Sequence, residues 1–307
     1  MENGRLKAGS DHFFTPQFYR RLQQLKIRTR RAYLGNRQGG HVSLRKGYGL
    51  EFSDYKLYTM GDDFRNIDWG AFARSDRLYV KQFREEQDLN VVFLIDGSAS
   101  MAGMLPYEGT SPKFAFCSKL ALALGYTALT DGDTVSFSVL GQKSSQKFAG
   151  PKSLPKAEKF LAGIKPGGNI DFAREIGSAV ARLRTPGKCF IISDFLCGVE
   201  EVIAGVKLLI GRNFEVVLFQ VMDSSELNLN SEFTKFASKV ADAETGEIID
   251  LALDEKSKRE YVKVLADHIE QIEQFAVKSG VPHVLISTDE NIEQVVLQRL
   301  LGLGLLK

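Results

Sequence analysis

The chain has 307 residues, of which 44% are apolar and 25% charged, and its net charge is +2. These values are typical of a folded protein with one large or two modest domains, and they exclude a disordered or fibrous chain. No apolar run reaches the roughly 18 residues that a membrane-spanning helix needs, and the first residues do not resemble a secretory signal. Three cysteines without CxxC spacing predict neither a disulfide framework nor a zinc site. We therefore expect a cytoplasmic protein.

Charge is unevenly distributed along the chain. Residues 1–90 hold 17 Lys and Arg against 11 Asp and Glu, whereas the remainder holds 23 against 27. The stretch 20–46 contains nine basic residues and no acidic one. Such a stretch can bind nucleic acid, an anionic membrane or an acidic protein surface. Because nucleic-acid binding normally shows a larger basic excess and recognisable motifs, we favour a solvated helix face or a protein-contact surface.

The first third of the chain predicts one helix followed by mostly irregular structure. Residues 15–34 have a capping threonine, a proline at the first helical position and apolar residues near helical spacing. Five glycines between residues 35 and 49 should break any long element. Residues 50–77 read as loops and short extended pieces, whereas the alternation over 78–85 predicts a half-buried strand.

From residue 90 onward, predicted strands and helices alternate. Strands are expected at 90–96, 134–140, 188–194, 214–222 and 283–288, and helices at 113–130, 153–163, 171–184, 199–210, 254–279 and 289–301, with a short β excursion over 232–253. This order implies right-handed βαβ crossovers and a mostly parallel sheet with helices on both faces. We predict a doubly wound α/β domain at 90–307, preceded by a smaller mixed helix and short-strand region at 1–89.

Polar residues follow three segments that a parallel sheet brings to one edge, where ligands bind in such folds. These residues are Asp96, Ser98 and Ser100 after the first buried strand, Asn169 and Asp171 in a glycine-containing loop, and Asp194 at the end of the strand 188–194. Carboxylate and hydroxyl oxygens suit Mg²⁺, Mn²⁺ or Ca²⁺. Neutral serine ligands would leave the ion able to take a carboxylate from a partner. The structural alternative is a polar turn that caps the next helix.

The segment DGSASM resembles the DxSxS element of the metal-ion-dependent adhesion site (MIDAS) in von Willebrand factor A domains. IISD resembles the element that supplies that site's distant aspartate. The resemblance implies a von Willebrand factor A-like fold, with Asp96, Ser98, Ser100 and Asp194 as metal ligands. Asn169 stands where that family's intermediate loop normally offers a threonine, so its amide oxygen and the carboxylate of Asp171 compete for this ligand position.

The segment GYGLEFSDYKLYTMGDDFRNIDWGAFARSDRLYVKQFREE closely resembles the signature of the bacterial family called domain of unknown function 58 (DUF58), and the resemblance covers about residues 40–300. It implies a partner of MoxR-type AAA+ ATPases that assists assembly or metal insertion in protein complexes. The signature either forms an ion network with a tryptophan as packing anchor, or docks onto the ATPase or gates the metal site. The residues concerned are Asp62, Asp63, Arg65, Asp68, Trp69 and Arg74.

We predict a non-enzymatic, metal-dependent adaptor that binds an acidic residue of a client protein and works with a MoxR-type AAA+ ATPase. One alternative is a Mg²⁺-dependent phosphatase of the haloacid dehalogenase type, but Ser98 stands where its second acid would be needed. Another alternative is a nucleic-acid-binding protein that uses the stretch 20–46. The sequence has no GxxxxGK[ST] loop, so we do not expect this chain to hydrolyse ATP.

Overall fold

The computed structural model describes residues 13–30, 38–47, 51–87, 89–102, 112–142, 144–227, 240–241, 248–249 and 255–307. Its centre is a six-stranded sheet in the order β11-β8-β7-β4-β5-β6. The strands are β4 (Asn90–Asp96), β5 (Thr134–Leu140), β6 (Ser144–Ala149), β7 (Lys188–Ser193), β8 (Glu215–Met222) and β11 (His283–Ser287). All neighbours are parallel except β5 and β6. The predicted mostly parallel α/β sheet is confirmed, whereas the antiparallel edge strand β6 was not predicted.

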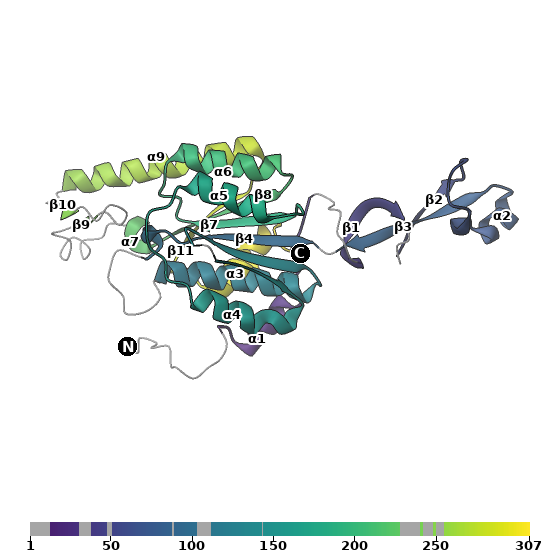
Figure 1. Ribbon diagram of the computed structural model, residues 1–307, viewed down its shortest axis with the longest axis horizontal. Coiled ribbons are helices and arrows are strands. Elements are labelled where there is room, and N and C mark those ends of the chain that lie inside the picture. Colours follow the sequence, from purple (N-terminus) through teal and green to yellow (C-terminus); the bar gives the residue numbers. More distant parts are fainter. Residues whose placement is uncertain are drawn as a thin grey trace.

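Helices cover both faces of this sheet (Figure 1). One face carries α1 (Pro16–Leu22), α3 (Pro112–Thr130), α4 (Leu154–Ala162), α10 (Ile292–Gln294) and η4 (Val295–Leu300), and the other carries α5 (Phe172–Arg182), α6 (Val199–Gly211) and α9 (Glu255–Ser279). In β4, Phe93 points into the first core and Val92 and Leu94 into the second. Burial on both sides explains why this strand is a continuous apolar run.

The segment that follows α1 differs from the prediction. The helix expected over 15–34 ends at Leu22, and the chain then pairs with the C-terminal segment. The backbone N–H of Lys26 donates to the carbonyl of Lys307 at 2.8 Å, and the reverse bond is 2.9 Å long. Ile27 is fully buried beside this pairing. The C-terminal segment therefore supplies backbone hydrogen bonds that a longer helix would have made internally.

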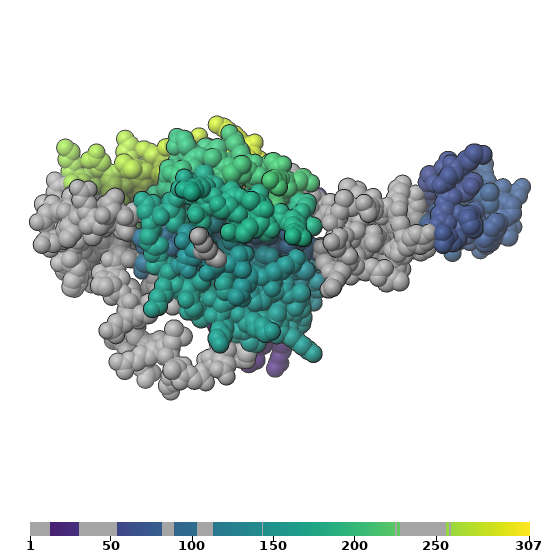
Figure 2. All heavy atoms as spheres, viewed as in Figure 1, coloured from purple at the N-terminus to yellow at the C-terminus, as the bar shows by residue number. Residues whose placement is uncertain are grey.

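A second, three-stranded antiparallel sheet in the order β1-β3-β2 precedes β4. Its elements are β1 (Gln38–Gly47), β2 (Glu51–Leu57), the short helix η1 (Phe64–Asn66), α2 (Trp69–Ser75) and β3 (Tyr79–Gln87). We call residues 51–87 the arm, and its β2, α2 and β3 extend away from one end of the larger sheet (Figures 1 and 2). The predicted strand over 78–85 is confirmed as β3. The expected loops and short extended pieces over 50–77 are consistent with β2, whereas the helix α2 was not predicted.

The remaining short elements connect the larger ones. They are η2 (Ala99–Ala102), η3 (Pro151–Ser153), α7 (Ser224–Leu227), β9 (Val240–Ala241) and β10 (Ile248–Ile249). The antiparallel pair β9 and β10 confirms a β excursion, although most of the predicted range 232–253 lies outside the described residues. Within the described part of the chain, no helix is both long and apolar enough to cross a membrane. The domain boundary at residues 89 and 90 stays a prediction.

Candidate metal centre

The DGSAS loop begins at the carboxyl end of β4, where the connections of β4 and its neighbour β7 leave toward opposite faces of the sheet. Asp96 is 3% exposed, and its Oδ1 accepts a hydrogen bond from the backbone N–H of Ser98 at 2.8 Å. Its Oδ2 accepts from the hydroxyl of Ser193. The hydroxyl oxygens of Ser98 and Ser100 lie 2.9 Å apart. Two adjacent ligands of an octahedral Mg²⁺ at about 2.1 Å lie about 3.0 Å apart, so this spacing suits the ion.

Two close approaches hold the loop in this shape. A Cβ at Gly97 would lie 2.6 Å from the carbonyl oxygen of Leu140 and 2.7 Å from a methyl carbon of Val139, so only glycine fits against β5. The carbonyl of Gly97 also accepts from the backbone N–H of Gly167 at 2.8 Å, and Gly168 accepts from Ala99 at 2.9 Å. The glycine loop predicted at 167–171 therefore lies against the DGSAS loop.

Asp194 follows β7 and is 1% exposed. Its Oδ1 accepts from the backbone N–H of Leu196 at 3.1 Å, and its Oδ2 accepts from the ammonium of Lys113 at 3.0 Å. Lys113 is itself 1% exposed and also donates to Oε1 of Glu226 at 2.6 Å. Lys113 comes from α3 and Glu226 from α7, so four segments meet here. Sequence reasoning missed Lys113 and Glu226, because neither follows a recognisable motif.

The pKa values of Asp96 and Lys113 are shifted by burial and by the neighbouring charges of this centre. Burial, together with the negative charge of Asp194, raises the pKa of Asp96 to about 6, against the hydrogen bonds from Ser193 and Ser98. Burial disfavours the charged form of Lys113, but the carboxylates of Asp194 and Glu226 outweigh burial, and the pKa of Lys113 is raised. Lys113 therefore stays an ammonium ion.

The buried charges of this centre do not balance. With the three carboxyls of Asp96, Asp194 and Glu226 ionised, Lys113 supplies one positive charge against three negative ones. The remaining two negative charges match one divalent cation. Buried charge is costly unless it is paired or coordinates a metal. The donor set of Asp96, Ser98, Ser100 and Asp194 therefore fits a hard divalent ion in both charge and oxygen chemistry.

The other two predicted ligands are placed differently. Asp171 is exposed and caps α5, since its Oδ1 accepts from the backbone N–H of Arg174 at 2.9 Å. The capping role accounts for a carboxylate at this position. Asn169 is exposed and directly follows Gly168, which bonds to the DGSAS loop. Direct coordination by Asn169 or Asp171 stays a prediction.

Comparison with known proteins assigns the chain to a family. The family described as protein of unknown function DUF58 matches residues 54–271, which is more than two thirds of the chain. The chain belongs to the DUF58 family. It is 24% identical to the uncharacterized protein Mb1516 of Mycobacterium bovis and to the uncharacterized protein Rv1480 of Mycobacterium tuberculosis, over 288 residues that cover 90% of this chain and 86% of each relative.

Two solved structures resemble this DUF58 protein at low identity. One is the conserved hypothetical protein BatB of Bacteroides thetaiotaomicron, at 16% identity and a TM-score of 0.40, covering 70% of this chain and 98% of that one. The other is an aerotolerance-related membrane protein of Bacteroides fragilis, at 14% identity and a TM-score of 0.40, covering 71% and 98%.

Three aspartates of the DUF58 signature hold turns and helix ends in the arm. Asp62 accepts from Lys56 at 2.9 and 3.0 Å and from the backbone N–H of Thr59 at 2.9 Å. Asp63 caps η1 and lies 3.4 Å from the guanidinium of Arg65. Asp68 caps α2 and also accepts from the hydroxyl of Tyr55 and from Lys81, at 2.7 and 3.2 Å. These contacts support the structural interpretation of the aspartates.

Two aromatic residues of the signature, Phe64 and Trp69, are strongly exposed. The side chain of Trp69 is 63% exposed and that of Phe64 68%, while Met60 beside them in sequence is fully exposed. The expectation that Trp69 is a packing anchor was therefore wrong; its ring contacts Phe72 edge-on at 6.2 Å. Arg74 lines a shallow hollow of about 180 Å³ on the arm.

The position of the arm bears on whether it gates the metal site. The arm joins β4 at Asn90, and the candidate metal centre begins at Asp96, at the other end of the same strand (Figure 1). Seven residues at about 3.3 Å each place these ends roughly 20 Å apart. This separation argues against direct gating of the metal centre by the arm.

The basic stretch 20–46 contacts this protein's own α/β domain where it is described. Lys26 lies 2.5 Å from Oδ1 of Asp131, and the carbonyl of Arg28 accepts from the buried ammonium of Lys188. The backbone N–H of Arg30 donates to Glu215 at 2.8 Å. Residues 31–37 lie outside the described part. These contacts give part of the basic stretch a structural role.

Proposed function

We propose that this DUF58 protein is a non-enzymatic, metal-dependent adaptor that binds an acidic residue of a client protein and works with a MoxR-type AAA+ ATPase. The single observation that carries the proposal is the unbalanced buried charge beside two hydroxyls at the spacing of neighbouring metal ligands. It supports a von Willebrand factor A-like domain whose MIDAS consists of Asp96, Ser98, Ser100 and Asp194. A Mg²⁺ ion held there would offer an open position to a carboxylate oxygen of the client.

The protein's own residues prepare this centre. Ser193 and the backbone of Ser98 hold the carboxylate of Asp96, so little freedom is lost when an ion binds. Lys113 holds one oxygen of Asp194, which fixes the direction of this carboxylate and limits the negative charge. Such preorganisation favours binding because the side chains are ordered beforehand.

Two side chains near the metal centre, His268 and Cys117, are poorly suited to take part in hydrolysis, which supports a binding role. The Nε2 of His268 is hydrogen-bonded to the carbonyl oxygen of Phe195 at 2.7 Å, so this ring nitrogen is already occupied. Burial raises the pKa of Cys117 well above its usual value, so its thiol stays protonated and is a poor nucleophile. We therefore propose that the centre binds a partner without catalysing a reaction.

The arm supports the second half of the proposal. Exposed aromatic residues are enriched in protein-binding sites. Phe64 and Trp69 are both exposed and lie close in sequence on the arm, which projects from the larger domain (Figure 2). We propose that the arm contacts the ATPase while the metal centre at the opposite end of β4 contacts the client. The family resemblance suggests the ATPase as partner.

The proposal is tested by co-purifying the full chain with the MoxR-type ATPase of the same organism and its bound clients, in Mg²⁺ and in EDTA. We expect client capture in Mg²⁺ only, and its loss in Asp96→Ala, because the substitution removes a ligand. Asp289→Ala, which removes an exposed carboxylate after β11 at the same edge of the sheet, should retain capture. Unchanged capture in EDTA would contradict the proposal.

A further inference from the structure

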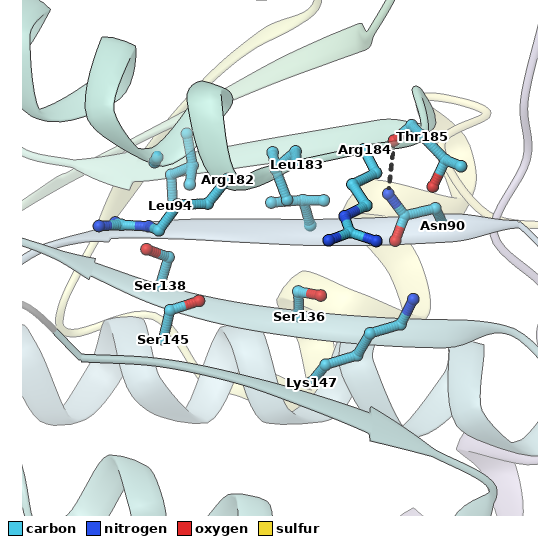
Figure 3. Close-up of a pocket in the computed structure, with 12 residues that line it drawn as sticks. Asn90, Leu94, Ser136, Ser138, Ser145, Lys147, Arg182, Leu183, Arg184 and Thr185 are labelled. Atoms are coloured by element: carbon cyan, nitrogen blue, oxygen red, sulfur yellow. Dashed lines mark hydrogen bonds between the residues drawn. The ribbon is translucent and has the colours of Figure 1, made fainter.

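A pocket of about 280 Å³ lies on the face of the sheet that α5 and α6 cover, beside the C-terminal end of α5 (Figure 3). Its floor is formed by β4, β5 and β6, and its wall by the end of α5 and the loop to β7. The side-chain amide of Asn90 donates to the carbonyl of Thr185 at 2.9 Å and holds this loop against the sheet. The pocket lies beside Asn90, Val92 and Leu94 of β4, and none of the candidate metal ligands lines it.

Successive side chains of β5 point to opposite faces of the sheet, and this alternation explains which residues form the floor of the pocket. Val135, Phe137 and Val139 point into the core that α3 and α4 cover, so the residues between them point to the opposite face. Those residues are Ser136 and Ser138, which are 7% and 5% exposed. Within the part of the chain that the structure describes, neither hydroxyl has a hydrogen-bond partner. Both serines line the pocket, so their hydroxyls are available to a ligand that enters it.

The register between β5 and β6 places further polar side chains directly beside these two serines. Lys147 on β6 is the direct cross-strand neighbour of Ser136, and Ser145 is the neighbour of Ser138. Arg182 and Arg184 contribute from the wall, and Figure 3 shows Arg184 and Lys147 extending toward the end of the pocket where Ser136 lies. The pocket thus combines three cationic side chains with the hydroxyls of three serines and of Thr185.

This charge is not balanced by the protein. None of the twelve residues that line the pocket is acidic. Among the described residues, the cationic groups of Lys147, Arg182 and Arg184 form no salt bridge. Guanidinium groups and hydroxyls together are the donors that recognise phosphate oxygens. The volume is close to the lower limit of ligand pockets, which suits a small molecule better than a nucleic-acid duplex.

We propose that this pocket binds the phosphate group of a small phosphorylated molecule. Ser136 and Ser138 donate from the floor to phosphate oxygens, and Arg182, Arg184 and Lys147 neutralise the charge from the rim. The site is distinct from the metal centre, because it shares no residue with it.

The test is a titration of the full chain with inorganic phosphate and pyrophosphate, by calorimetry and thermal unfolding, in EDTA and at constant ionic strength. EDTA separates this test from the proposed metal-dependent function. We expect saturable binding and a rise in Tm for the unmodified chain. Arg182→Gln combined with Arg184→Gln should weaken binding about tenfold or more, because each arginine makes charge-assisted hydrogen bonds.

The matched control is Lys207→Gln combined with Arg212→Gln, two exposed cationic residues at the end of α6, which should bind as the unmodified chain does. Ser138→Ala is a second variant that removes a floor hydroxyl without changing charge, and it should also weaken binding. Circular dichroism checks that each variant is folded. The absence of saturable binding, equal weakening in the control, or equal binding of succinate would each overturn the proposal.

Discussion

The ammonium nitrogen of Lys113 lies 3.0 Å from Oδ2 of Asp194, and both side chains are 1% exposed. The same ammonium lies 2.6 Å from Glu226, so one cation holds two carboxylates that come from different segments. A buried cation so close to a predicted metal ligand could replace the metal only if it balanced the whole negative charge. When Asp96, Asp194 and Glu226 are all ionised, Lys113 balances one of three negative charges.

Replacing Lys113 with methionine should strongly destabilise the fold. The substitution keeps the length of the side chain but leaves Asp194 and Glu226 buried without their cation. Removing one partner of a buried pair typically costs about 3–5 kcal/mol. Urea unfolding followed by circular dichroism measures the change, with Lys156→Met on the exposed face of α4 as control. A loss below about 1 kcal/mol in Lys113→Met would show that the pair is not important for stability.

Gly97→Ala should damage both the loop and the fold. The added methyl would lie 2.6 Å from the carbonyl oxygen of Leu140, so β5 or the DGSAS loop must move. Overpacking of this kind typically costs about 1–3 kcal/mol. Gly167→Ala, in the adjacent loop, is the matched control because nothing lies within 4 Å of its added methyl. Equal stability of the two variants would contradict the close packing at Gly97.

Acid should unfold the arm only at low pH. Hydrogen bonds from Lys56 and Thr59 lower the pKa of Asp62 to about 2, and the bond from Tyr55 lowers that of Asp68. For carboxylates with a lowered pKa, the stabilisation is present above the unfolded value of about 3.9 and is lost as pH falls through the folded value. Fluorescence of Trp69, the single tryptophan, should stay constant from pH 7 to 4 and change below about pH 3.

The matched variant for this acid prediction is Asp68→Asn, which still offers a capping oxygen to α2 but cannot titrate. Its fluorescence change should be smaller, because only Asp62 still titrates within this pair. Asp289→Asn, an exposed residue outside the arm, should behave as the unmodified chain. A fluorescence transition above pH 4 in the unmodified chain would show that these contacts do not hold the arm.

Phe64→Ala combined with Trp69→Ala should weaken ATPase binding about tenfold or more and leave metal binding unchanged. Exposed aromatic residues often carry much of the energy of an interface, and the arm joins β4 at the end opposite the metal centre. Surface plasmon resonance with the immobilised ATPase measures the effect. Leu208→Ala, an exposed apolar residue on α6, is the control. If both variants bind equally well, the arm is not the docking surface.

Much of the sheet could be predicted because its strands carry strong local signals. β4 is a continuous apolar run followed by Asp96, and its predicted bounds agree with the structure. The helix α9 could be predicted because Leu265, Ile272 and Ala276 recur at helical spacing, and all three are buried. The convergence of Asp96 and Asp194 followed from the rule that parallel strands end at one edge.

What could not be predicted depends on contacts between distant segments. Lys113 reads as one polar residue of a helix, and only the fold brings it to Asp194, 81 residues away. The end of α1 at Leu22 depends on pairing with the C-terminal segment. The helix α2 was not predicted, because the glycine and aspartates that precede it favour loops locally.

Direct measurement of metal binding tests the central claim most sharply. Calorimetric titration of the metal-free chain with Mg²⁺, and with Mn²⁺ as a second probe, should show one saturable site per chain. Asp96→Asn should abolish it, Ser98→Ala should weaken it, and Asp289→Asn, at an exposed residue outside the centre, should leave it intact, with folding checked for each variant. The absence of a saturable site in the unmodified chain, or unchanged binding in Asp96→Asn, would contradict the account of this centre.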